Sequence, residues 1–93
     1  MKTATHTFNT IHGQVTVQID IFEMDAVEAI DVYELPADLY SSGGYRIEGF
    51  VNGVPRGTRF YTGLLGSSYY GEGTEEAACD FLAEAHQQGF FAA

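Results

Sequence analysis

TEEAACDFLAEAHQQG, residues 74–89, is the stretch that decides the fold, because both its secondary structure and its facing can be read from the sequence. Thr74 is a suitable helix N-cap, and Gly89 can end the helix in a left-handed conformation. Four apolar residues recur at the helical spacing i, i+3, i+4 and i+7 and form one stripe: Ala78, Phe81, Leu82 and Ala85. The stretch therefore predicts an amphipathic helix that buries this stripe.

A row of carboxylates runs along the same helix, away from the apolar stripe. Glu76, Asp80 and Glu84 are each four residues apart, and the helix has no Lys or Arg. Like charges at this spacing each cost about 0.2–0.5 kcal/mol, so the row does not help the helix to form. The row either serves solubility or contacts something outside the chain.

Two β-hairpins are predicted ahead of the helix. Residues 4–11 and 14–23 carry the first, because apolar and polar residues alternate along the second of these segments. Residues 45–51 are followed by Asn52-Gly53, a strong signal for a type I′ turn. The return strand runs from Pro55 to about residue 62, and Pro55 places its start at a sheet edge or after a bulge.

The tight register of the second hairpin predicts two faces. Tyr45, Ile47 and Val51 would share one face with Val54, Thr58 and Phe60. Arg46 and Arg59 would lie opposite each other beside Glu48. Two such guanidinium groups can grip an anion, but the acidic surroundings favour an internal balance of charge.

The remaining segments complete the fold class. Residues 25–34 fit either a strand or a short helix, and the helix is favoured because Asp25 can be its N-cap with Glu28 at the capping-box position. Residues 37–44 read as a loop, and residues 67–71 as a short fifth strand. We therefore expect one α+β domain over residues 1–93. It would have an antiparallel sheet of four or five strands, a C-terminal helix across one face and a short helix near residues 25–34.

The charge balance excludes several kinds of partner. Four Lys and Arg residues stand against thirteen Asp and Glu residues, for a formal net charge of −9. Binding to DNA, RNA or an anionic membrane needs clustered Lys and Arg, so none of these is expected as a direct partner. A basic protein surface is the complement. Seven acids and no base fall between residues 20 and 38: Asp20, Glu23, Asp25, Glu28, Asp31, Glu34 and Asp38.

No catalytic, cofactor or metal motif is present. Cys79 is the single cysteine, and its place beside the apolar stripe predicts a small buried residue. His6 and His12 lack a placed carboxylate or thiolate, so no metal site is predicted. Calcium binding is not expected, because the D-x-D-x-D-G loop is missing. An enzyme would have to use Glu23 with Glu48, or Cys79 with His86, and we expect no enzymatic activity.

The sequence predicts a cytoplasmic protein. No apolar run approaches the roughly 18 residues that span a bilayer. The first ten residues, MKTATHTFNT, lack the apolar core of a secretory signal. The cytoplasm would be that of the host cell if the chain is phage-encoded.

The run from Tyr45 to Ala85, a hairpin, a short strand, G-E-G-T and an alanine-rich helix, resembles the strand–helix half of a double-stranded-RNA-binding domain. That resemblance implies the layout of these elements. It does not imply RNA binding, because Glu75 and Glu76 stand where that family places phosphate-gripping lysines.

The expected function is protein binding. In size, acidity and lack of catalytic motifs the chain is similar to inhibitors that phages and mobile elements use against CRISPR or restriction complexes, by nucleic-acid mimicry. Its partner would be a basic surface of a nucleic-acid-binding complex. The alternative is a small structural or assembly protein that forms a homodimer or larger homo-oligomer. The residues expected to contact the partner are Glu76, Asp80, Glu84, Asp25, Glu28, Asp31, Tyr69 and Tyr70.

Overall fold

The computed structural model describes residues 2–62 and 72–92, with the side chains of residues 72 and 73 left aside. The predicted fifth strand and the two predicted aromatic contacts, Tyr69 and Tyr70, lie outside the described residues. Within them, no helix has both the length and the apolar character needed to cross a bilayer. In chain order the elements are β1 (Lys2–Thr10), β2 (Gly13–Met24), η1 (Glu28–Val32), α1 (Ala37–Tyr40), β3 (Gly44–Val51), β4 (Val54–Tyr61) and α2 (Glu72–Gln87).

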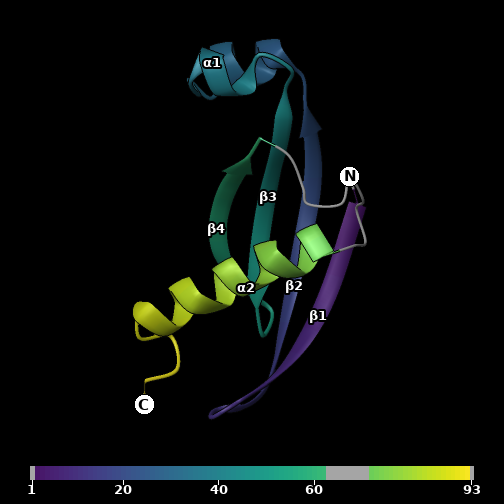
Figure 1. Ribbon diagram of the computed structural model, residues 1–93. Coiled ribbons are helices and arrows are strands. Elements are labelled where there is room, and N and C mark those ends of the chain that lie inside the picture. Colours follow the sequence, from purple (N-terminus) through teal and green to yellow (C-terminus); the bar gives the residue numbers. More distant parts are fainter. Residues whose placement is uncertain (1, 63–71, 93) are drawn as a thin grey trace.

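The four strands form one antiparallel sheet in the order β1-β2-β3-β4, and α2 crosses one face of it (Figure 1). This architecture confirms the predicted α+β class. The first hairpin is as expected, although its turn lies at Ile11 and His12, one residue earlier than predicted. Residues 26–32 are helical, so the helix favoured for residues 25–34 is correct for most of that segment.

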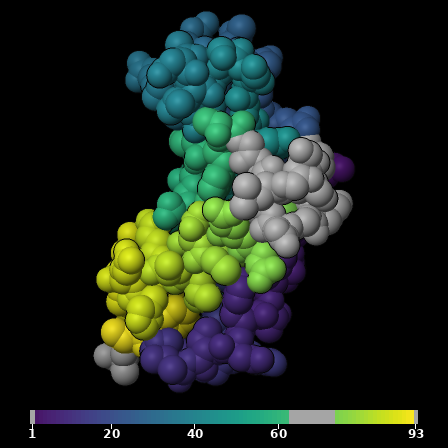
Figure 2. All heavy atoms as spheres, viewed as in Figure 1, coloured from purple at the N-terminus to yellow at the C-terminus, as the bar shows by residue number. Residues whose placement is uncertain are grey.

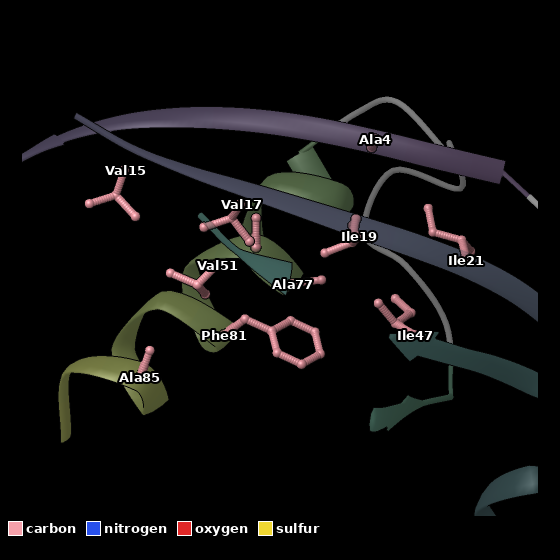
Figure 3. Packing of buried hydrophobic residues seen from close by; sticks show 11 residues of the cluster. Ala4, Val15, Val17, Ile19, Ile21, Ile47, Val51, Ala77, Phe81 and Ala85 are labelled. Carbon is pink, nitrogen blue, oxygen red and sulfur yellow. The ribbon is translucent and has the colours of Figure 1, made fainter. Parts of the chain in front are cut away.

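The main core lies between α2 and the sheet (Figure 3). Alternate residues of β2 point to this face because side chains alternate along a strand. The predicted apolar stripe of α2 packs against these residues. Ala77, which is not part of the predicted stripe, is also buried in this core, whereas Leu82 is only partly buried. The buried members of this core are Ala4, Val15, Val17, Ile19, Ile21, Ile47, Val51, Ala77, Ala78, Phe81 and Ala85.

Gly49 allows the helix to approach the sheet. A methyl group at this position would lie 2.4 Å from Cδ1 of Phe81, far inside ordinary contact distance. The ring of Phe81 is 1% exposed, so it packs directly on the backbone of β3. A glycine is needed here for close approach rather than for an unusual backbone conformation.

The two ends of α2 differ in how well they were predicted. Thr74 is not the N-cap, because the helix begins two residues earlier, at Glu72. Thr74 is fully buried, and its hydroxyl shares a 3.2 Å hydrogen bond with Nε2 of His6. The predicted C-terminal end is confirmed: Gly89 has a φ of 76°, and the amide of Phe90 donates to the carbonyl of Ala85 at 2.9 Å. These contacts form a Schellman motif.

The predicted register of the second hairpin is wrong. The Asn52-Gly53 turn pairs Val51 with Val54 as expected, but a bulge near Gly49 and Phe50 shifts every pair beyond it by one residue. Arg59 consequently pairs with Ile47, and Arg46 with Phe60. Thr58 and Phe60 therefore lie on the face opposite Ile47, contrary to the prediction. The bulge and the edge position of β4 agree with the placement of Pro55.

Candidate functional site

Residues 23–40 form a lobe at one end of the molecule, away from the part of the sheet that α2 crosses (Figures 1 and 2). The lobe contains the end of β2, η1 and α1. A small core of its own holds it together, with Met24, Ala29 and Tyr40 buried at the centre. The partly buried residues around this centre are Ile30, Tyr33, Leu35 and Phe60.

Asp25 starts the helical turns of the lobe. Its carboxylate accepts a 2.8 Å hydrogen bond from the amide of Glu28, and its carbonyl accepts one from Ala29 at 3.0 Å. Asp25 therefore performs the capping role that the sequence predicts. The next turn is a π-helix, in which the amide of Tyr33 reaches back five residues to the carbonyl of Glu28 at 3.2 Å.

The segment after η1 turns sharply and then forms α1. Glu34 has a φ of 57°, a left-handed conformation that costs a non-glycine residue roughly 1–2 kcal/mol. Pro36 precedes α1, whose four residues fall inside the predicted loop at residues 37–44. The loop prediction is therefore wrong for Ala37–Tyr40. The short helix forms because the carbonyl of Pro36 accepts hydrogen bonds from Leu39 and Tyr40 at 3.1 and 3.0 Å.

The lobe carries six acids on its surface. All are exposed except Glu28, which is half-buried. The two ion pairs of the described residues, Arg46–Glu48 and Arg59–Glu84, include none of the six. The lobe's carboxylates therefore take part in neither of these ion pairs, although Arg46 lies 5.9 Å from the centre of the Tyr33 ring in the lobe. The acids are Glu23, Asp25, Glu28, Asp31, Glu34 and Asp38.

Three large apolar side chains are exposed among these acids. Val27 is 66% exposed, Val32 64% and Leu39 59%. Single exposed apolar residues are ordinary, and these three are the apolar area that the lobe offers to another molecule. The sequence contained a signal for two of them. As a helix, residues 25–34 place Ala26, Ala29, Ile30 and Tyr33 on one apolar face, and Val27 and Val32 are not part of it.

The carboxylate row of α2 is divided by the fold. Glu76 is exposed, as expected for a contact residue. Asp80 accepts a 2.9 Å hydrogen bond from the hydroxyl of Tyr61. Glu84 pairs with Arg59 at 3.1 Å, and both side chains are more than one-third exposed. Two of the three acids thus have partners within the chain, whereas none of the lobe's six acids is in either ion pair.

Tyr61 is affected by its contact with Asp80. Burial of the phenol, followed by the hydrogen bond to Asp80 and the charge of that carboxylate, raises the pKa of Tyr61 well above its ordinary 10.0. The hydroxyl therefore stays protonated and donates to Asp80 at neutral pH. The contact links β4 to the middle of α2.

The three arginines are all engaged within the fold. Arg46 donates to Glu48 at 2.8 Å and lies 4.0 Å from the centre of the Phe22 ring. Arg59 lies on the opposite face of the sheet, where it pairs with Glu84. Arg56 donates to Gln88 and lies over the ring of Phe90. The anion site considered from the sequence is not formed, because the bulge separates Arg46 from Arg59.

The carboxylate pair considered for catalysis is not assembled either. Glu23 pairs with Tyr45 in the sheet and Glu48 with Asp20, so Glu23 and Glu48 lie on opposite faces. The acids that the fold does bring together are Asp20 and Glu48, directly opposite each other on the face away from α2. Asp20 accepts hydrogen bonds from Thr3 at 2.9 Å and Gln18 at 3.2 Å, and these offset the repulsion.

Cys79 is exposed, which corrects the prediction of a buried residue. It lies on the rim of a groove of about 300 Å³ together with His12 and His86. Partial desolvation, followed by the nearby charges of Glu75 and Asp80, raises the pKa of the Cys79 thiol. A raised pKa disfavours the thiolate that a nucleophile requires.

The two histidines of the first hairpin contact different ends of α2. His6 contacts Thr74 under the start of α2. His12, in the turn after β1, lies instead beside His86 in the last turn of α2. Sequence spacing had no means to show this pair, because 74 positions separate the two residues.

The site that stands out is thus the lobe, with exposed acids around three exposed apolar side chains. Of the predicted contact residues, the structure brings together Asp25, Glu28 and Asp31 in the lobe and places Glu76, Asp80 and Glu84 apart from them on α2. Comparison of the chain with protein-family models, curated proteins and solved structures gave no match.

Proposed function

We propose that this protein is an acidic binding protein whose lobe occupies a basic, nucleic-acid-binding surface of a partner protein. The observation that carries the proposal is the lobe's set of six acids without an ion pair in the described structure, placed around Val27, Val32 and Leu39. The acids supply long-range attraction to a basic surface, and the apolar side chains supply the area that holds the complex once formed.

The proposed partner class follows from the sign and spacing of the charges. A surface that binds nucleic acid is rich in Lys and Arg, and such a surface attracts clustered carboxylates as it attracts phosphates. The proposed biological role is inhibition of a CRISPR or restriction complex in the manner of phage and mobile-element inhibitors. In the proposed complex the lobe makes the main contact, and Glu76 adds a second acidic contact from α2.

The test measures competition with DNA on purified CRISPR effector complexes and restriction endonucleases. The lobe variant D25N/E28Q/D31N/E34Q/D38N removes five charges, and Asn at position 25 keeps the helix cap because Asn and Asp cap equally well. The control variant E75Q removes an exposed charge from α2 that lies outside both proposed contacts. We expect the wild-type protein and the control to displace DNA from a partner, with weaker displacement at higher salt.

The lobe variant should bind at least tenfold more weakly, and its affinity should change less with salt. A second variant, V27S/V32S/L39S, should weaken binding without altering the salt dependence. If the wild-type protein displaces DNA from none of these complexes, or if neutralising the lobe leaves affinity unchanged, the proposed function is wrong. Circular dichroism of each variant checks that the fold is retained.

The second candidate function is homo-oligomeric assembly through the edge strand β1. Its register with β2 is unbroken from Lys2 to Thr10, and it contains no proline or bulge. The other edge, β4, is interrupted by Pro55 and by the bulge. Regular edge strands pair readily with a second copy. Light scattering over a range of protein concentration decides between a monomer and a homodimer, and substitution of Thr7 by proline should abolish a dimer formed this way.

A further inference from the structure

Two imidazole rings meet at the end of the molecule formed by the β1–β2 turn and the last turn of α2. The ring centres of His12 and His86 are 5.4 Å apart, and the ring planes are inclined by 47°. Phe91 stacks on His12 with the ring centres 4.7 Å apart and the planes within 8° of parallel. Stacking occupies one face of the His12 ring, and both histidines are exposed.

The separation of the two rings lies within the range of ordinary aromatic contacts, and it also admits a shared metal ion. Zinc binds histidine nitrogen at about 2.0–2.1 Å in tetrahedral geometry, which puts each ring centre about 3.2 Å from the metal and two such centres about 5.2 Å apart. The observed 5.4 Å agrees with this value.

The surroundings admit and favour a cation. His12, His86 and Phe91 line both the groove of about 300 Å³ and a second hollow of about 170 Å³. His86 lies in the last turn of α2, where the helix dipole places partial negative charge. The net charge of −9 raises the local concentration of cations around the protein.

We infer that His12 and His86 form a binding site for a divalent transition-metal ion of the zinc class. Two imidazole nitrogens select such an ion over calcium or magnesium, which bind oxygen. In the described residues, no group of three or more metal-ligating side chains gathers. Cys79 precedes His86 by seven residues, about 10.5 Å along the helix axis, so it does not complete the set. Two coordination positions remain for water or for a ligand from another molecule.

Titration calorimetry of the metal-free protein with zinc chloride tests the inference. We expect one zinc ion per chain, and H12Q and H86Q should each weaken binding at least tenfold, equivalent to about 1.4 kcal/mol. H6Q is the control, because His6 contacts Thr74 and lies outside the pair. Zinc should raise the midpoint of thermal unfolding of the wild type and of H6Q, but not of the other two variants, and EDTA should reverse the effect.

Three results would overturn the inference: no zinc binding by the wild type, equally tight binding by H12Q or H86Q, or a loss of binding in H6Q alone. Equal binding by a histidine variant would mean that surface carboxylates hold the metal. NMR signals of the imidazole rings in the wild type provide a readout that needs no variant to fold. Zinc should shift the signals of His12 and His86 and leave those of His6 in place.

Discussion

Replacement of Gly49 by alanine tests how α2 is held against the sheet. The new methyl carbon would lie 2.4, 2.5 and 2.6 Å from three ring atoms of Phe81, whereas ordinary contacts are 3.4–4 Å. The ring or the whole helix must therefore retreat by about 1 Å, and overpacking of this kind costs about 1–3 kcal/mol. We expect G49A to lower the free energy of unfolding by that amount.

The same substitution should behave differently once the ring is gone. F81A alone should cost about 3–5 kcal/mol, because it empties a fully buried site. In the F81A background the added methyl group meets open space, and alanine is better than glycine in a strand by roughly 0.5–1 kcal/mol. G49A should then be neutral or stabilising. The two substitutions should therefore couple by about 2–3 kcal/mol.

Urea unfolding followed by circular dichroism measures these free energies for the wild type, both single variants and the double variant. F81L offers a second background that removes less volume and preserves more stability. If the methyl group at position 49 costs the same free energy whether Phe, Leu or Ala occupies position 81, the close approach of Phe81 is not the reason for the glycine.

Three further perturbations test other parts of the structure. The folded state raises the pKa of Tyr61 above 10.0, so the free energy of unfolding should fall as the pH rises through about 10. Urea titrations between about pH 9 and about pH 11 should show a smaller fall for Y61F than for the wild type. G89A forces a left-handed φ of 76° on alanine and should cost about 1–2 kcal/mol; an unchanged thermal midpoint would contradict the Schellman motif. D25A should cost about 0.5–2 kcal/mol because the cap to Glu28 is lost, whereas D25N should cost little, and equal losses would show that charge rather than capping matters.

The sequence predicted the parts of the fold that depend on local patterns. The helical spacing of Phe81 and Ala85 identified the buried face of α2, and Gly89 identified its end. Thr74 failed as an N-cap because the hydroxyl that fits a cap also fits a buried hydrogen bond, here to His6. A choice between these roles depends on tertiary packing, which the local sequence does not contain.

The register of the second hairpin shows a similar limit. Asn52-Gly53 predicted the turn correctly, yet one bulge moved Arg59 to the face of α2 and Phe60 to the other. The position of a bulge depends on contacts such as that of Phe81 with Gly49, which join residues far apart in the sequence. A shift of one residue exchanges the two faces of a strand, so a small local feature overturned the predicted anion site.

The candidate site was predicted in part. The acids between residues 20 and 38 were evident from composition alone, and the structure places six of them on the lobe, five exposed and Glu28 half-buried. Which acids of α2 would find internal partners was not evident, because Tyr61 and Arg59 reach Asp80 and Glu84 only through the fold. The pairing of His12 with His86 likewise arises only where the β1–β2 turn meets the last turn of α2.

The position of the lobe has a consequence for how the protein meets other molecules. The described molecule measures 42 by 24 by 19 Å, and the six acids of the lobe lie at one end of it. Arg56, His12 and His86 lie on elements away from that end. This arrangement amounts to a permanent electric dipole along the molecule. A cationic surface would exert a torque on it before contact, so the protein would arrive end-on, and fewer collisions would be lost to unproductive orientations.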